Sequence, residues 1–256
     1  MERLLAGLIC IVLVSSGGCV LVPGKQPFGA HWPDLEQVGD AALGAAKDPN
    51  TWVPLVGAAL LAIDDYDQQL SDWAVDHQPL FDDDASDISH DLKDATTVLW
   101  LASALAAPSE GLGQKVGGIA VGVGTLFVEG RIIEGLKDVT ERDRPDDSND
   151  RSMPSGHASM VAARTRLTRA NLERIDMPTW VRRSASAGLY GIAFATSWAR
   201  VEAGKHHPTD VLVGYAIGNF VASFAQMAFL EDSVKGTEIS FSAVEGGGAL
   251  TLRVPL

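Results

Sequence analysis

The stretch from Lys137 to Asp210 constrains this 256-residue chain more than any other part of it. Prolines interrupt the stretch repeatedly, and basic or histidine residues stand close to these prolines. Because proline either ends a helix or opens its first turn, we expect helices whose ends lie beside basic side chains. Two arginines, a lysine and two histidines at helix ends indicate a pocket for an oxyanion.

Composition narrows the class of protein. Acidic residues outnumber basic ones, 33 against 20, and the formal net charge is −13. This balance argues against nucleic acid as a partner, because nucleic acids are bound through net basic surfaces. The many alanine, glycine and leucine residues indicate a helical bundle. The predicted fold class is therefore all-α, with a short β-hairpin at the C-terminus.

The first residues have the pattern of a secretory signal. Arg3 precedes an apolar run from Leu4 to Val14, and small residues follow. The run is shorter than the roughly 20 residues that a membrane span needs. We interpret residues 1–18 as a signal peptide, and Cys19 as a candidate lipidation site. The alternatives are an ordinary signal peptide followed by a chance cysteine, or an uncleaved anchor.

The remaining chain divides into a tether, a helical domain and a tail. Residues 19–33 contain several prolines and glycines and predict a tether. The helical domain is expected over 34–235, with its motif core at 95–230. In the tail, 236–256, apolar residues alternate on both sides of a glycine run, which predicts the β-hairpin. Apolar spacing predicts helices over 34–47, 52–75, 95–107, 114–139, 156–175, 180–199 and 208–229, and a solvated acidic loop over 81–94.

The first basic cluster consists of Lys137 and Arg144, which is followed by Pro145. Arg144 offers a planar fork that can bind two phosphate oxygens, and Lys137 offers a mobile point charge. Taken alone, two cations near a helix end are equally explained as partners of the helix dipole. The first cluster therefore indicates a phosphate site only in combination with the other two.

The second cluster is Pro154-Ser155-Gly156-His157. Ser155 is a natural N-cap for the helix that follows, and Gly156 lets the backbone approach a ligand closely. The free amides and the dipole at that helix start favour an anion, which His157 in the first turn would face. The alternative is a capped helix with an exposed histidine.

The third cluster contains Arg200, His206 and Asp210, with Pro208 suited to the first turn of a new helix. This spacing predicts that Asp210 lies within reach of the His206 ring. A carboxylate on Nδ1–H would fix the tautomer and leave Nε2 free as an acceptor or nucleophile. The alternative is a surface turn with an aspartate that caps a helix.

In their order and spacing, the three clusters resemble the motifs of the type 2 phosphatidic acid phosphatase and vanadium haloperoxidase superfamily, which includes bacterial acid phosphatases and lipid phosphatases. The resemblance covers about residues 95–229. It implies a metal-independent phosphomonoesterase, without a cofactor, in which vanadate can bind as a phosphate mimic. His206 would attack phosphorus to give a phosphohistidine, Asp210 would orient His206, and His157 would protonate the leaving alcohol and later activate water. Phosphate binding is implied for Lys137, Arg144, Ser155, Gly156 and Arg200.

Two positions depart from the family pattern. Ala199 stands where the family usually has a serine, so one hydroxyl contact to phosphate is expected to be missing. Only eight residues separate Pro145 from Pro154, where the family tends to have a dozen or more. This short loop is acidic and is expected at the entrance of the pocket, where it would disfavour highly anionic substrates.

The resemblance implies a phosphate-ester substrate, either a lipid phosphate or a small soluble ester. With the N-terminal signal, it predicts a location in the bacterial cell envelope, on the periplasmic side, with membrane association through the N-terminus. An integral membrane protein is the alternative, but the arginines within 156–175 argue against that helix crossing lipid. The same residues are also compatible with a vanadate-dependent haloperoxidase, or with a non-catalytic envelope lipoprotein on the same scaffold.

Overall fold

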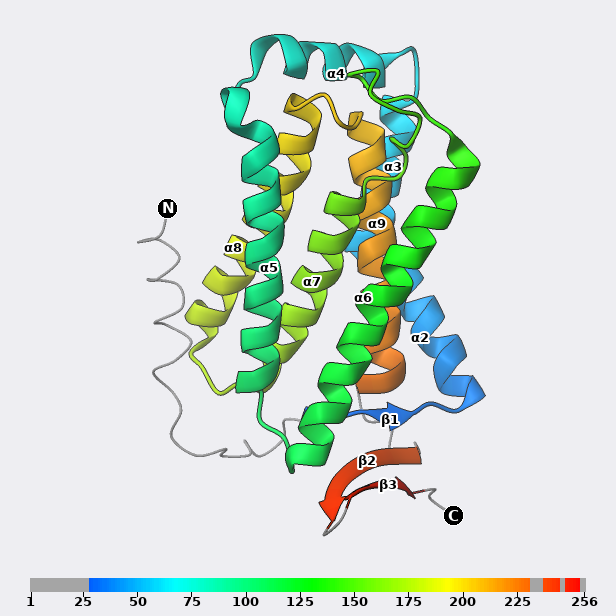
Figure 1. Ribbon diagram of the computed structural model, residues 1–256, viewed down its shortest axis with the longest axis vertical. Helices are drawn as coiled ribbons and strands as arrows, with labels where there is room; N and C mark the ends of the chain where they lie inside the picture. Colours follow the sequence, from blue (N-terminus) through cyan, green and yellow to red (C-terminus); the bar gives the residue numbers. More distant parts are fainter. Residues whose placement is uncertain (1–27, 231–236, 245–246, 254–256) are drawn as a thin grey trace.

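The computed structural model describes residues 28–230, 237–244 and 247–253. Long helices run side by side along the molecule, which confirms the predicted all-α bundle (Figure 1). The helices are α2 (Leu35–Lys47), α3 (Pro49–Leu61), α4 (Tyr66–His77), α5 (Ala85–Ala106), α6 (Leu112–Thr140), α7 (Gly156–Arg174), α8 (Thr179–Glu202) and α9 (Pro208–Ala225), which a π-helical turn extends over Gln226–Leu230.

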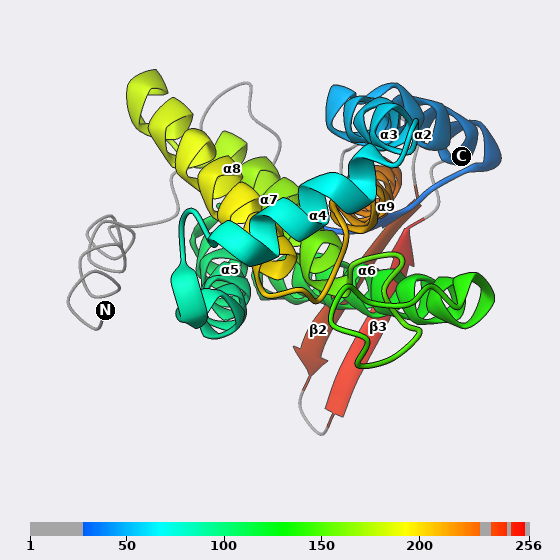
Figure 2. The same cartoon turned by 90° about the horizontal axis from the view of Figure 1, so that it is seen from above.

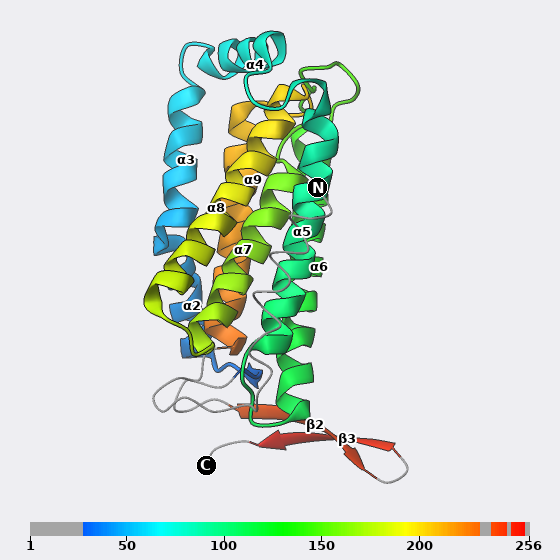
Figure 3. The same ribbon diagram turned by 90° about the vertical axis from the view of Figure 1, so that its left-hand side faces the viewer.

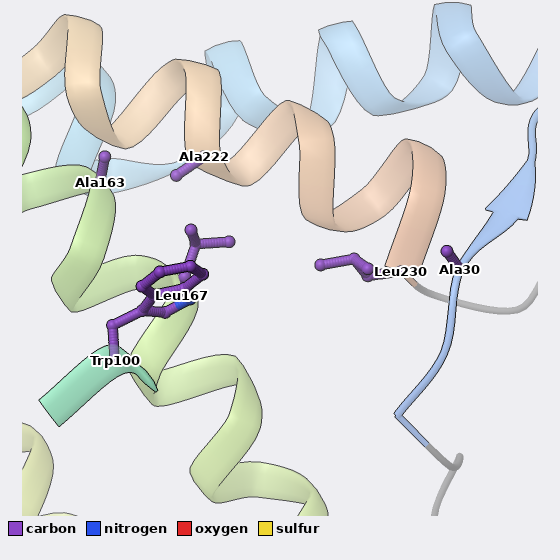
Figure 4. Close-up of a cluster of buried hydrophobic side chains, with 6 residues drawn as sticks. All are labelled: Ala30, Trp100, Ala163, Leu167, Ala222 and Leu230. Carbon is purple, nitrogen blue, oxygen red and sulfur yellow. The ribbon is translucent and has the colours of Figure 1, made fainter. Parts of the chain in front are cut away.

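Helix α7 occupies the middle of the bundle. Seen from above, α5, α6, α8 and α9 surround it, and α4 crosses the top (Figure 2). Small side chains let its neighbours approach closely: Ala163 of α7 and Ala222 of α9 are fully buried. They belong to a core cluster with Trp100, Leu167, Ala30 and Leu230 (Figure 4). Burying these apolar groups holds α5, α7 and α9 in one rigid unit.

Three strands lie at the end of the bundle opposite α4 (Figure 3). They are β1 (His31–Trp32), β2 (Thr237–Val244) and β3 (Gly247–Arg253), in the order β1-β2-β3. The pairing is antiparallel, with His31 opposite Glu238 and Ile239 opposite Leu252. Residues 245–246 lie outside the described residues, so the turn of the predicted hairpin stays a prediction.

The beginning of the chain differs in part from expectation. Residues 1–18 and Cys19 lie outside the described residues, so the signal peptide and the lipidation site stay predictions. Phe28, near the end of the expected tether, is buried, and its backbone N–H donates to Pro108 O at 2.7 Å. The end of the expected tether is therefore packed against the bundle, because an aromatic side chain gains more from burial than from exposure.

The acidic segment after α4 also differs from expectation. A loop was predicted over 81–94, but a 3₁₀ turn forms at Asp82–Asp84 and α5 begins at Ala85. The aspartates stand at and before the first turn of α5, where the helix dipole stabilises negative charge. Ala85 and Ser89 are buried on the inner face of this helix. The prediction took the run of charges as the mark of a solvated loop. In the structure these charges lie at the start of the helix and on its outer face, so the first turns of α5 were missed.

Two helices are long and apolar enough to cross a membrane, by length and composition. They are Leu112–Thr140, which is α6, and Pro208–Leu230, which is α9 with its π turn. In the apolar window of α6, 28% of the residues are buried inside the protein, compared with 61% in α9. α9 therefore has the burial of a core helix, whereas α6 presents most of its apolar surface to the outside.

Candidate active site

Four helix ends meet at the end of the bundle where α4 lies. Helices α6 and α8 end there, and α7 and α9 begin there (Figure 1). Each of the three basic clusters is carried by these helix ends or by the loops that join α6 to α7 and α8 to α9. The structure therefore brings together the eight site residues singled out from the sequence: Lys137, Arg144, Ser155, Gly156, His157, Arg200, His206 and Asp210.

His206 is held by the loop that precedes α7. Its ring is 2% exposed, and Nδ1 lies 2.6 Å from the backbone carbonyl of Ser152. Because a carbonyl can only accept, Nδ1 carries the proton, and in the neutral ring Nε2 is left with its lone pair. Burial lowers the pKa of His206 to about 3, and nearby Arg200 and Arg144 act in the same direction. The ring is therefore neutral at neutral pH, as a nucleophile requires.

Asp210 lies beside His206, but it does not form the expected hydrogen bond with it. Its Oδ2 is 3.9 Å from His206 Nδ1, and it accepts instead from the Ser152 hydroxyl at 2.5 Å. The reason is local: Asp210 is the third residue of α9, so its carboxylate turns back to cap the backbone N–H of His207 at 2.8 Å. Asp210 thus acts on His206 through Ser152.

The two arginines keep donors that other groups of the protein do not use, whereas Lys137 is paired with Glu134 at 3.1 Å. Arg200 is 5% exposed, and burial, followed by the nearby Arg144, lowers its pKa to about 10, so it stays charged. Within the described part of the chain, Nε of Arg144 and Nε of Arg200 are buried without a hydrogen-bond partner. The ammonium of Lys137 lies 3.7 Å from the position that a Cβ on Gly156 would take. Buried donors without partners beside a helix N-terminus are suited to an anion.

The start of α7 is built as the sequence predicts. Ser155 is the N-cap, and its hydroxyl accepts from the backbone N–H of Ala158 at 3.4 Å. The backbone N–H of Ser155 donates to Asp210 O at 2.9 Å, so the second and third clusters are joined directly. A Cβ on Gly214 of α9 would lie 2.4 Å from Ser155 O. Glycine is needed there, because no other residue lets α9 come so close to this turn.

His157 contacts α5. Its ring meets that of His90 edge to face, with centroids 4.7 Å apart and an interplanar angle of 81°. Burial and the charge of Arg200 lower the pKa of His157 to about 2. Among the described residues, its buried Nε2 has no hydrogen-bond partner. His157 and His206 are thus two neutral imidazoles close enough to interact electrostatically.

Residues 117–231 match the family model described as the PAP2 superfamily, and this segment contains all eight site residues. The matched segment, a little under half of the chain, is thus similar to the PAP2 superfamily. Its fold is similar to the crystal structure of a transmembrane PAP2 type phosphatidylglycerolphosphate phosphatase from Bacillus subtilis, with a TM-score of 0.54 and 20% sequence identity. The similarity covers 75% of this chain and 95% of that chain. No curated protein matches the sequence. The PAP2 match and the structural similarity together support a phosphatase.

Sequence reasoning missed Arg142, which links elements on two sides of the PAP2 site. Its guanidinium donates to Asp210 Oδ1 at 2.7 Å, to Asp67 Oδ2 at 2.7 Å and to Thr209 Oγ1 at 2.7 Å. Asp67 is on α4, so Arg142 joins the helix across the end of the bundle to the start of α9. Its position two residues before Arg144 indicated that Arg142 lies near the site. Its partners could not be predicted, because they are distant in the sequence.

Two further neighbours of the PAP2 site come from α5 and the connecting loop. The hydroxyl of Ser89 accepts from Arg200 Nη1 at 3.3 Å, so a hydroxyl lies beside this arginine although position 199 is alanine. Ser152, described above, contacts both His206 and Asp210. Neither serine stands in a motif, and α5 was not expected to begin early enough to reach the site.

The short loop between Pro145 and Pro154 is tied to both sides of the PAP2 site. Asp146 pairs with Lys205, and its backbone N–H donates to Gly204 O at 3.0 Å. Burial by itself would raise the pKa of Asp146, but hydrogen bonds from Lys205 and Ser148 lower it to about 2. Arg151 turns toward α6, where it pairs with Glu134 and Asp138. Of the three aspartates in this loop, Asp146 is therefore paired, while the positive charge of Arg151 is taken up by α6.

Proposed function

We propose that this PAP2 protein is a metal-independent phosphomonoesterase that acts through a phosphohistidine on His206. One observation carries the proposal: His206 is buried, neutral and fixed through Nδ1, with Asp210 3.9 Å from Nδ1 and two arginines close enough to act on the ring electrostatically. This arrangement leaves Nε2 as a nucleophile beside cations that can bind the phosphate under attack.

In the proposed first step, Nε2 of His206 attacks phosphorus and the bond from phosphorus to the ester oxygen breaks. The leaving alkoxide takes a proton from His157. In the second step, His157 removes a proton from water, and the resulting hydroxide displaces His206 from phosphorus, which releases inorganic phosphate. Lys137, Arg144 and Arg200, with the amides at the start of α7, would stabilise the equatorial oxygens.

The low pKa of His157 is compatible with its role as a general acid. Its pKa is lowered by burial and by positive neighbours, chiefly Arg200. A phosphate dianion among these cations adds two negative charges within a few ångströms, which raises the pKa of both histidines. With its pKa raised by the bound substrate, His157 would take up a proton, which it then donates to the leaving oxygen.

A lipid phosphate is the substrate class that the surface favours. Large apolar side chains are exposed along the outer faces of α3, α5 and α6. Exposed apolar surface of this extent is typical of contact with a membrane or a partner. Membrane association is thus supported by the protein itself, and we propose that it is reinforced by the N-terminal segment, through a signal anchor or through Cys19, on the periplasmic side of the cell envelope. The exposed residues include Trp52, Leu60, Leu101, Leu105, Val123, Phe127 and Val139.

The test is phosphate release by the purified protein from phosphatidic acid, phosphatidylglycerolphosphate and a soluble aryl phosphate. We expect activity that vanadate inhibits and EDTA does not. Rapid quenching with ³²P-labelled substrate should trap an acid-labile phosphoenzyme in the wild type and none in His206→Gln. His77→Gln, which changes an exposed histidine on α4, is the matched control. Full activity in His206→Gln contradicts the mechanism, and halide oxidation with vanadate and peroxide without phosphate release favours the haloperoxidase alternative.

A further inference from the structure

A groove of about 340 Å³ lies between α6 and the first turns of α7. Its walls are mainly apolar, with Leu126, Phe127, Ile133 and Met160 among them. One end reaches Gly156, the glycine of the phosphate-binding turn. The groove therefore connects the site of the chemistry with the apolar outer surface of α6.

The groove begins beside the phosphate-binding turn, on the side of α7 that faces α6. Met160 follows Gly156 by one helical turn, so both lie on one face of α7, next to the face that carries His157 and Arg164. Arg164 donates to Lys93 O on α5 at 2.9 Å, and His157 meets His90 on the same helix. The alcohol of a phosphate ester bound at Gly156 would continue along this neighbouring face into the groove.

One buried acid interrupts the apolar walls. Glu129 of α6 lines the groove and is 1% exposed. Its Oε1 accepts from the hydroxyl of Ser159, but Oε2 is buried and has no hydrogen-bond partner within the described ranges. An unsatisfied buried carboxylate oxygen is costly, and its retention beside a binding groove points to a group that the ligand supplies.

The position of Glu129 limits where that group stands in the ligand. Ser159, its partner, lies four residues after Ser155, which is about 6 Å along the helix at roughly 1.5 Å per residue. Burial raises the pKa of Glu129, and the hydrogen bond from Ser159 and the nearby charges of Arg164 and Lys137 oppose this shift. Glu129 therefore lies in the same charged region as the phosphate site. A hydroxyl within a few bonds of the ester oxygen can reach it.

We propose that Glu129 is a specificity-determining residue that accepts a hydrogen bond from a free hydroxyl on the leaving alcohol of a lipid monophosphate, while the apolar chain lies in the groove. The inference rests on the proposed phosphatase function and names its substrate class: monophosphates of hydroxylated lipids. A lipid without this hydroxyl leaves Oε2 unpaired and is bound less tightly.

The test compares oleoyl lysophosphatidate, which has a free hydroxyl next to the phosphate ester, with its 2-deoxy analogue. We expect the wild type to prefer the hydroxylated lipid by about tenfold in kcat/KM, the typical worth of one such hydrogen bond. Glu129→Leu combined with Ser159→Ala should remove the preference while phosphate release from the deoxy lipid continues. Glu129→Gln, whose amide oxygen still accepts, should keep part of the preference, and Arg131→Gln, which alters another residue of the groove, should keep all of it.

Each outcome decides a separate point. Equal kcat/KM for the two lipids in the wild type overturns the inference and leaves the phosphatase proposal intact. An unchanged preference in the Glu129 and Ser159 double variant assigns Glu129 a structural role and also overturns the inference. If the double variant does not fold, the inference is tested by the wild-type preference for the hydroxylated lipid and by its reduction in Glu129→Gln. Absence of either result overturns the inference. Failure of the wild type to release phosphate from any ester overturns the proposed function, and the inference with it.

Discussion

The contact between α7 and α9 provides the sharpest test of how the site is positioned. A Cβ on Gly218 of α9 would lie 1.9 Å from Ser159 O, a backbone atom of α7. Real Cβ atoms essentially never approach another heavy atom within 3.0 Å, so α9 must move by more than 1 Å to accommodate alanine. Both helices start in the site, with Ser155 at one and Asp210 close to the start of the other.

The cost of Gly218→Ala follows from this geometry. Forcing an extra carbon into a packed interior costs about 1–3 kcal/mol. Since alanine also gains roughly 0.5–1 kcal/mol of helix propensity over glycine, the comparison needs a glycine without such a contact. A Cβ on Gly188 of α8 meets nothing within 4 Å, so Gly188→Ala isolates the propensity gain. A shift of about 1 Å in the site is expected to lower kcat/KM by about 100-fold.

Thermal and denaturant unfolding of the two variants, together with phosphate release, check the prediction. Gly188→Ala should be slightly more stable than the wild type and fully active. Gly218→Ala should be less stable than Gly188→Ala by about 1–3 kcal/mol and should lose most of its activity. If both variants have the same stability and activity, the close approach of α9 to α7 does not position the site, and the reasoning is refuted.

Three further predictions follow from the site. Arg142→Met, which removes a partner from two buried carboxylates, should lower the free energy of unfolding by about 2–4 kcal/mol, and adding Asp67→Asn should restore part of the loss in a double-mutant cycle. Because the pKa of His206 is near 3 in the folded protein and near 6.5 when unfolded, its contribution to stability is complete above pH 6.5 and declines as the pH falls. Between pH 7.5 and 5 the loss should be about 2 kcal/mol, and His206→Gln should reduce the pH dependence by that amount in unfolding titrations. Ser152→Ala, which keeps the carbonyl but removes the hydroxyl bond to Asp210, should lower kcat about tenfold with KM within about twofold; equal stability and kcat in this variant would contradict the link through Ser152.

The local features of the site were predictable because they follow from neighbouring residues. Ser155 and Pro208 begin helices, and the expected boundaries of α7 and α9 agree with the observed ones. α5 was predicted to begin ten residues late, at 95 instead of Ala85, because the acidic segment before it resembled a solvated loop. That error concealed Ser89 and His90 as neighbours of Arg200 and His157.

The link between Asp210 and His206 was predicted from spacing alone, and its geometry was different. A separation of four residues predicted direct contact, but the capping position of Asp210 turns its carboxylate toward His207 and Ser152. Spacing along a chain predicts which residues are near each other. The direction of a buried side chain depends on every donor around it.

The sequence by itself predicted the eight residues of the candidate site, the helix ends that carry them and the family that they resemble. These properties depend on capping, proline and charge, which act over one or two helical turns. Only the tertiary structure decided that Arg142 joins Asp67 to Asp210, that Ser152 stands between Asp210 and His206, and that Glu129 lines a groove beside Gly156. Such contacts join residues far apart in the chain, and they exist only because packing around α7 brings the surrounding helices to one place.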